Sequence, residues 1–113
     1  MTTSDEELRE LSRQYPDIEE GTEGGVRYYL IPGLRLPEGC TPDRVDGLLC
    51  PAGRDGYSSR LFLDIPVSCR TTRNWNASNV RILERNWFAV SWRVNKPNLR
   101  LAQLLAAHLD AFR

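Results

Sequence analysis

Histidine and cysteine are scarce in this sequence: His108 is the only histidine, and the three cysteines form no C-x-x-C pair. A zinc site needs about four nitrogen or sulfur ligands, so no metal centre is predicted. The sequence also lacks a glycine-rich phosphate loop and a G-x-S-x-G motif. It therefore indicates neither a bound nucleotide nor a serine hydrolase of that type, and we expect no cofactor.

Long apolar runs are absent too. The longest mostly apolar stretch, residues 101–109, is far shorter than the ~20 residues that span a bilayer. The N-terminal residues are polar and acidic and have no apolar core of the signal-peptide type. We therefore expect a cytoplasmic protein. Because disulfides are rare in that compartment, the three cysteines are expected to be free thiols.

An excess of charge of one sign is also missing, since 15 Lys and Arg residues balance 15 Asp and Glu residues. This balance argues against nucleic acid or a membrane as a partner. The charges are unevenly distributed: residues 1–24 carry eight acids and two bases, and residues 54–113 carry four acids and ten bases. Either the acidic segment lies across the basic one, or the basic part is a surface for an acidic partner. We favour the first interpretation, because opposite charges within one chain can satisfy each other.

What the sequence does contain is the composition of one folded domain over residues 1–113, with 41% apolar and 27% charged residues. At its start, Ser4 and Glu7 have the spacing of a helix capping box. Apolar residues follow at helical spacing up to Pro16, whose ring disfavours helical geometry in the residue before it. These features predict an amphipathic helix over residues 5–15.

Three short segments rich in β-branched and aromatic residues predict strands. They are residues 26–31, 45–50 and 61–65. The segment 21–25 before them predicts a flexible turn, and residues 67–78, with few apolar side chains, predict a long loop. Residues 80–83 are ambiguous, whereas the alternating apolar side chains of residues 88–94 predict a further strand or extended segment.

A second helix is predicted near the end of the sequence. From Leu101 onward, residues at i, i+3, i+4, i+7, i+8 and i+11 form one continuous face, which predicts a helix over about 99–111. Asn98, which follows a proline, is the expected N-cap. Consecutive strands joined by short turns favour an antiparallel meander. The predicted fold class is therefore α+β, with a helix at each end of the meander.

Candidate nucleophiles are few. A Ser-His or Cys-His pair would have to use His108, which lies on the apolar face of the predicted helix, so we expect it to be buried without contacting Cys69. Cys69 is the most interesting thiol, because Arg70 and Arg73 are close in sequence and nearby cations lower a thiol pKa. If Cys69 is the nucleophile, it must be exposed and partly ionised, because only the thiolate attacks. Cys50 ends a strand and should be less accessible.

Several short motifs resemble those of one protein family. They are Tyr29-Leu30-Ile31-Pro32-Gly33, Leu36-Pro37-Glu38-Gly39, Pro51-Ala52-Gly53 with Gly56-Tyr57, and the strand from Leu61 to Pro66. These motifs are similar to a leucine-proline-x-glycine turn, a P-x-G-Y-P turn and a strand ending in D-P-P in prokaryotic family E of the ubiquitin-conjugating superfamily. The aromatic run 87–92 is similar to that family's tryptophan-rich segment. The resemblance covers most of residues 5–112 and implies a ubiquitin-conjugating-like (UBC-like) fold with a long active-site-type loop before the last helix.

The resemblance also implies a function, that of a ubiquitin-conjugating-enzyme-like protein in a prokaryotic transfer pathway. Such a transferase accepts a ubiquitin-like protein from an activating enzyme as a thioester and passes it to an amine, so both proteins are expected partners. A cysteine thiolate suits this reaction because it is a good nucleophile and a good leaving group. Cys69 is the first candidate for the carrier, and Ser68 in the same loop is the alternative nucleophile.

The same loop supplies candidate binding residues. Asn74, Trp75 and Asn76 are candidates because an asparagine near the nucleophile often stabilises the oxyanion and an exposed tryptophan serves in binding. Arg70 and Arg73 are candidates for contact with an acidic partner surface. The chain lacks the His-Pro-Asn triplet of classical members, so it is open whether the chain is an enzyme. The alternatives are a non-catalytic adaptor of the same fold, which binds a ubiquitin-like protein or its activating enzyme, and an unrelated α+β binding module.

Overall fold

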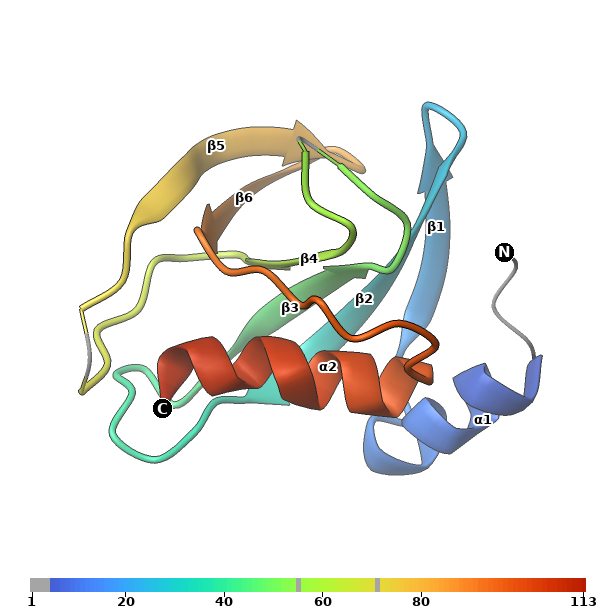
Figure 1. Ribbon diagram of the computed structural model, residues 1–113, viewed down its shortest axis with the longest axis horizontal. Coiled ribbons are helices and arrows are strands. Elements are labelled where there is room, and N and C mark those ends of the chain that lie inside the picture. Colours follow the sequence, from blue (N-terminus) through green and yellow to red (C-terminus); the bar gives the residue numbers. More distant parts are fainter. Residues whose placement is uncertain (1–4, 55, 71) are drawn as a thin grey trace.

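The computed structural model describes residues 5–54, 56–70 and 72–113, whose arrangement is shown in Figure 1. In chain order the elements are α1 (Asp5–Gln14), β1 (Glu19–Glu23), β2 (Val26–Arg35), β3 (Arg44–Cys50), β4 (Arg60–Leu63), β5 (Trp75–Ile82), β6 (Arg85–Val90), α2 (Leu101–Leu109) and a short 3-10 helix, η1 (Asp110–Phe112). The fold class is α+β, as the sequence predicted. Ser4, one half of the predicted capping box, lies outside the described residues.

The strands of the described residues form one antiparallel sheet in the order β1-β2-β3-β4-β6-β5. The first four strands are a meander, in which each strand pairs with the next along the chain. The β5–β6 hairpin joins the sheet through the pairing of Leu63 in β4 with Phe88 in β6. The predicted antiparallel meander is therefore confirmed, with one more strand before it and a hairpin after it.

Figure 1 shows the β5–β6 hairpin curving over the sheet toward β1, and the contacts at the hairpin tip agree. The Leu83 backbone N–H donates to Glu23 Oε1 at 3.0 Å. A Cβ added to Gly21 of β1 would lie 2.8 Å from a methyl carbon of Leu83, so the Leu83 side chain lies directly against β1. The last hairpin thus packs against the first strand, and the sheet is rolled.

Two hydrophobic clusters lie on the two faces of this rolled sheet. The cluster beneath the helices contains Leu49 and Leu63 together with Leu101 and Leu105 of α2. The cluster enclosed by the hairpin contains residues that alternate with these along the strands, with Trp87 among them. Because β3 and β4 are covered on both faces, each contains a continuous apolar run, residues 48–50 and 61–63, rather than an alternating pattern.

Both edge strands differ from the sequence prediction. Residues 19–23 form β1, and only Gly24 and Gly25, both with positive φ, make the turn that was expected over 21–25. Residues 75–82 form β5, so the loop predicted over 67–78 ends at residue 74. Edge strands have few buried side chains and therefore carry little of the apolar alternation by which strands are recognised in a sequence.

The ends of the other helices and strands differ from the sequence prediction by fewer residues. The predicted strand 26–31 continues to residue 35 across a register shift, and the strand predicted over 61–65 covers Arg60–Leu63. The strand predicted over 88–94 is β6, which begins earlier, at residue 85, and ends earlier, at residue 90. The first helix ends one residue before the predicted end.

The helix α2 begins at Leu101 after an N-cap at Arg100, and not at Asn98, whose φ is 60°. The Leu101 N–H donates to Glu7 Oε1 of α1 at 3.1 Å. Arg100 donates two hydrogen bonds of 2.8 Å to the carboxylate of Glu10. Acidic side chains of α1 therefore contact the start of α2, which agrees with the first interpretation of the charge distribution. Neither described helix is long and apolar enough to cross a membrane.

Candidate functional site

The loop between β4 and β5 carries the predicted nucleophiles, and backbone hydrogen bonds hold it in place. The Thr41 N–H donates to the Ser68 carbonyl at 2.7 Å, and the Ser68 N–H donates to the Thr41 carbonyl at 3.0 Å. This antiparallel bridge ties the loop to the connection between β2 and β3. Ser68 is exposed, whereas Cys69 is half-buried and packs against the cluster beneath the helices.

A cavity of about 210 Å³ opens beside Cys69. It is lined by Val67, Ser68, Cys69, Thr72, Arg73, Trp75 and Phe112. The cavity is smaller than the sites that usually hold cofactors or drug-sized ligands. It suits a short extended peptide or a single side chain, and it brings together four of the seven residues that the sequence singled out.

Cys69 is not ionised in the way the sequence predicted. Burial is the main cause that raises the pKa of its thiol to about 12, and a hydrogen bond with the Cys40 thiol raises it further. The charge of Arg73 acts in the opposite direction, but it is the weakest of the contributions. The expectation of an exposed thiolate activated by adjacent arginines is therefore wrong.

Arg70 and Arg73 do little to lower the pKa of Cys69, because the side chains of both arginines contact other groups. The Arg73 guanidinium donates to the Ala111 carbonyl and lies 5.0 Å from the centre of the Trp92 ring. The Arg70 side chain is exposed and lies 3.8 Å from a carboxylate oxygen of Glu38. Sequence proximity to Cys69 did not determine where these long side chains point.

The three candidate binding residues after this loop separate in space because β5 begins at Trp75. Trp75 is half-buried, lines the Cys69 cavity and lies 6.2 Å from the ring of Phe112. Asn74 is exposed, and its carbonyl accepts the Ser91 N–H at 2.7 Å. Asn76, the residue after Trp75, is exposed and does not line the Cys69 cavity, because its amide is hydrogen-bonded to Tyr57.

Asn76 belongs to a different cluster, which the sequence analysis did not identify. Its amide donates to the Tyr57 hydroxyl at 2.6 Å and accepts a hydrogen bond from Arg60. The Tyr57 and Ser91 hydroxyl oxygens are hydrogen-bonded at 3.2 Å, and the pKa of Tyr57 is lowered mainly because the Ser91 hydroxyl can donate to the ionised phenolate. The Arg60 guanidinium lies 4.2 Å from the centre of the Tyr57 ring. This network joins the turn before β4 to the hairpin.

We expect Tyr57→Phe to lower the free energy of unfolding by about 1–2 kcal/mol, because it removes both hydrogen bonds of the hydroxyl, to Asn76 and to Ser91, and leaves the Asn76 amide without its acceptor. Urea unfolding followed by tryptophan fluorescence measures this change. Asn76→Ala and the double variant complete a double-mutant cycle. A cycle in which the two effects simply add would contradict the coupling.

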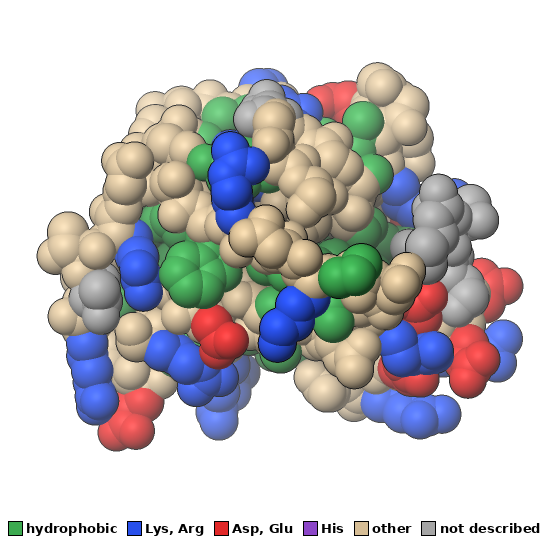
Figure 2. Space-filling model, in the orientation of Figure 1, with side chains coloured by type: hydrophobic (Ala, Val, Ile, Leu, Met, Phe, Trp, Pro, Cys, Tyr) green, Lys and Arg blue, Asp and Glu red, His purple; other side chains and the backbone are tan. Residues whose placement is uncertain are grey.

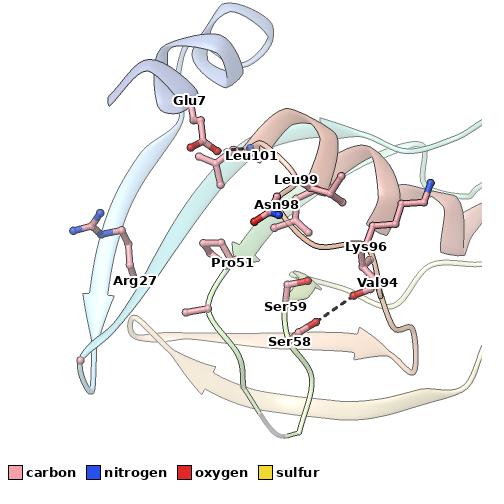
Figure 3. A pocket seen from close by; sticks show the side chains of 13 residues that line it. Glu7, Arg27, Pro51, Ser58, Ser59, Val94, Lys96, Asn98, Leu99 and Leu101 are labelled. Carbon is pink, nitrogen blue, oxygen red and sulfur yellow. Dashed lines mark hydrogen bonds between the residues drawn. The ribbon is translucent and has the colours of Figure 1, made fainter. Parts of the chain in front are cut away.

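A second cavity, of about 410 Å³, lies on another side of the molecule and is shown in Figure 3. It lies between α1, the turn before β4 and the segment leading into α2. Two serines are part of its wall: Ser58 Oγ donates to the Val94 carbonyl at 3.2 Å, and Ser59 Oγ is 2.8 Å from His108 Nε2. The structure therefore contains a Ser-His pair.

His108 is 3% exposed, as the sequence predicted, and its ring hydrogen-bonds to Ser59 rather than to a cysteine. Burial and, secondarily, the charge of Arg60 lower the pKa of His108 to about 4. A general base must take up a proton from its serine, but here burial and a neighbouring cation disfavour the imidazolium. The Ser59–His108 pair therefore satisfies two buried polar groups and is not an activated nucleophile.

The three cysteines are free thiols, as expected. Cys50 is buried and donates to the Ala52 carbonyl at 2.8 Å, so its predicted lower accessibility is confirmed. Cys40 is also buried, and its thiol donates to the Phe112 carbonyl at 3.3 Å. Among the residues that the structure describes, no three His, Cys, Asp or Glu side chains gather in a group that could hold a metal ion.

Comparison with protein-family models, with curated proteins and with solved structures gave no match. Figure 2 shows acidic side chains gathered over α1 at the lower right, while Lys and Arg side chains are spread across the same face.

Proposed function

We propose that this chain is a UBC-like, ubiquitin-conjugating-enzyme-like protein of a prokaryotic transfer pathway, which accepts a ubiquitin-like protein from an activating enzyme. The order of its elements supports the proposal. A helix precedes an antiparallel meander, a nucleophile-bearing loop follows the last meander strand, and a tryptophan-containing hairpin precedes the last helix. This is the order that the resemblance to prokaryotic family E implies.

The observation that carries the proposal is the position of Cys69. The bridge between Thr41 and Ser68 holds it directly after the meander, at the edge of a cavity walled by Arg73 and Trp75. A carrier cysteine must present its sulfur to an extended peptide terminus while water is largely excluded, and a fixed loop beside a small cavity meets both requirements. Ser68, exposed beside it, is the alternative nucleophile.

The transfer step is chemically balanced without a cofactor. The Cys69 sulfur attacks the carbonyl carbon of the ubiquitin-like protein's terminal thioester and forms a new S–C bond. The S–C bond to the activating enzyme's cysteine breaks, and the leaving thiolate takes up the proton that Cys69 gives up. Because the isolated chain keeps Cys69 protonated, the activating enzyme has to supply the environment in which this proton leaves.

A non-catalytic adaptor is the second candidate, and the same thiol favours it. A half-buried, protonated cysteine has the properties of a packed side chain rather than of an activated nucleophile. In this alternative the chain binds the ubiquitin-like protein or the activating enzyme, and Cys69 takes part only through contact.

One reconstitution distinguishes the two candidates. The chain is mixed with ATP, a prokaryotic ubiquitin-like protein and the activating enzyme of that protein, and the products are separated with and without thiol reductant. A carrier gives an adduct that the reductant cleaves. Cys69→Ala should abolish this adduct completely, whereas the matched control Cys50→Ala should retain it, because Cys50 is buried on a strand.

The other outcomes are equally informative. An adduct that resists reductant and disappears in Ser68→Ala would move the role to the hydroxyl. Binding of either partner without any adduct would favour the adaptor. If the chain binds neither partner and forms no adduct, the proposed function is contradicted.

A further inference from the structure

Cys40 and Cys69 are directly opposite each other across two backbone segments. Thr41 and Ser68 exchange both of their N–H···O bonds, which makes them a hydrogen-bonded antiparallel pair. The next pair in this register is Cys40 with Cys69. In an antiparallel arrangement that next pair is non-hydrogen-bonded, with Cα atoms about 4.5 Å apart and side chains at their closest. This separation lies within the range that disulfides use.

The two side chains also point to the same side. Cys40 is part of the cluster beneath the helices, and Cys69 packs against that same cluster. The Cys40 thiol is also close enough to Cys69 to contribute to the raised pKa of that thiol. Phe112 contacts both positions, since its carbonyl accepts the Cys40 thiol and it lines the Cys69 cavity. The third cysteine, Cys50, belongs to the cluster on the other face of the sheet, and its thiol donates a hydrogen bond to the Ala52 carbonyl.

We propose that Cys40 and Cys69 are a dithiol site that closes to an intramolecular disulfide when the protein meets a thiol oxidant such as oxidised glutathione. Cys69 reacts first, because it is half-buried at a cavity while Cys40 is 6% exposed. This inference goes beyond the proposed function and holds for a carrier, an adaptor or another binding module. In a carrier, the disulfide would occupy the sulfur that forms the thioester, so oxidation would stop transfer and reduction would restore it.

The exchange takes two balanced steps. The Cys69 thiolate attacks one sulfur of oxidised glutathione, forms a mixed disulfide and releases one glutathione thiolate. The Cys40 thiolate then attacks the Cys69 sulfur, forms the Cys40–Cys69 bond and releases the second glutathione. Two electrons pass from the cysteine sulfurs to the oxidant, and the two thiol protons end on the two glutathione molecules.

The experiment uses the full chain, freed of reductant, with oxidised glutathione at mildly alkaline pH for several hours. The protein is then denatured, alkylated with iodoacetamide and analysed as intact mass and as proteolytic peptides. We expect a monomer that has lost two hydrogen atoms, a cross-linked peptide pair containing Cys40 and Cys69, and alkylation at Cys50 alone. Cys50→Ser, the matched control, should form the same bridge.

Single variants test the order of the steps. Cys40→Ser should accumulate the glutathione mixed disulfide at Cys69, because no resolving thiol remains, and Cys69→Ser should form no bridge. If either variant fails to fold, the peptide pair from the unaltered chain and from Cys50→Ser decides the matter. A bridge that involves Cys50, bridges only between two molecules, a persistent glutathione adduct in the unaltered chain, or three unreacted thiols would each overturn the proposal.

Discussion

Lowering the pH from 7 to 4 is expected to reduce the free energy of unfolding by about 3 kcal/mol through His108 alone. Its pKa is lowered to about 4 in the folded chain, against an ordinary value of 6.5. Between these two values the unfolded chain binds a proton that the folded chain excludes. Stability is therefore complete above about pH 7, falls as the pH drops through this window, and reaches its full loss near pH 4.

Urea unfolding of the unaltered chain and of His108→Gln at pH 7, 5.5 and 4 measures this contribution. The glutamine does not titrate and retains groups that can hydrogen-bond with Ser59. Carboxylates titrate in both proteins and cancel in the comparison. We expect the variant to lose about 3 kcal/mol less than the unaltered chain over this pH range, although it is less stable at pH 7. If the free energy of unfolding falls equally with pH in both proteins, His108 is not held neutral by the fold.

The Cys69 thiol is expected to react with iodoacetamide about fiftyfold more slowly at pH 8 than an ordinary cysteine. With a pKa of about 12, only about one thiol in ten thousand is ionised at that pH. The more basic thiolate is also the better nucleophile, which offsets part of the roughly thousandfold loss of thiolate. The rate should keep rising, by about tenfold for each pH unit, through pH 10, where an ordinary thiol has levelled off.

Mass spectrometry of the peptide containing Cys69 follows this reaction under native conditions. Cys40→Ala is the informative variant, because it removes the hydrogen bond and the charge interaction that raise the pKa of Cys69. We expect faster alkylation of Cys69 in that variant at every pH below 10. A rate in the unaltered chain that levels off near pH 9 would show that the thiol is unperturbed and would strengthen the carrier over the adaptor.

The elements that the sequence predicted best are those with a complete apolar face. The helix α2 and the strand β3 each bury enough side chains for their pattern to be recognised without the fold. The helix α1 buries only Leu11, and its prediction depended also on the capping-box spacing and on Pro16. The edge strands β1 and β5 were missed, because an edge strand is held mainly by backbone hydrogen bonds to one neighbour and these bonds leave no mark on side-chain type. The N-cap of α2 was misplaced because its capping carboxylate, Glu7, comes from the other helix.

In the candidate site, too, some properties of single side chains were predicted from the sequence and others were not. Cys69 and Trp75 do line one cavity, as their closeness in the chain suggested. The ionisation of Cys69 was predicted in the wrong direction, because it depends on burial and on Cys40, which belongs to a distant segment. The partner of His108 could not be predicted either, since Ser59 is 49 positions away and lies on a different element.

The sequence by itself therefore determined the α+β class, the meander, the two helices, the burial of His108 and the inaccessibility of Cys50. These properties follow from apolar periodicity and turn chemistry, which act over a few neighbouring residues. Only the tertiary structure decided that the hairpin packs on β1, that Arg73 binds the Ala111 carbonyl, and that Cys40 faces Cys69. Each of these depends on which backbone segments far apart in the chain lie side by side, and that choice is made by the packing of the whole core.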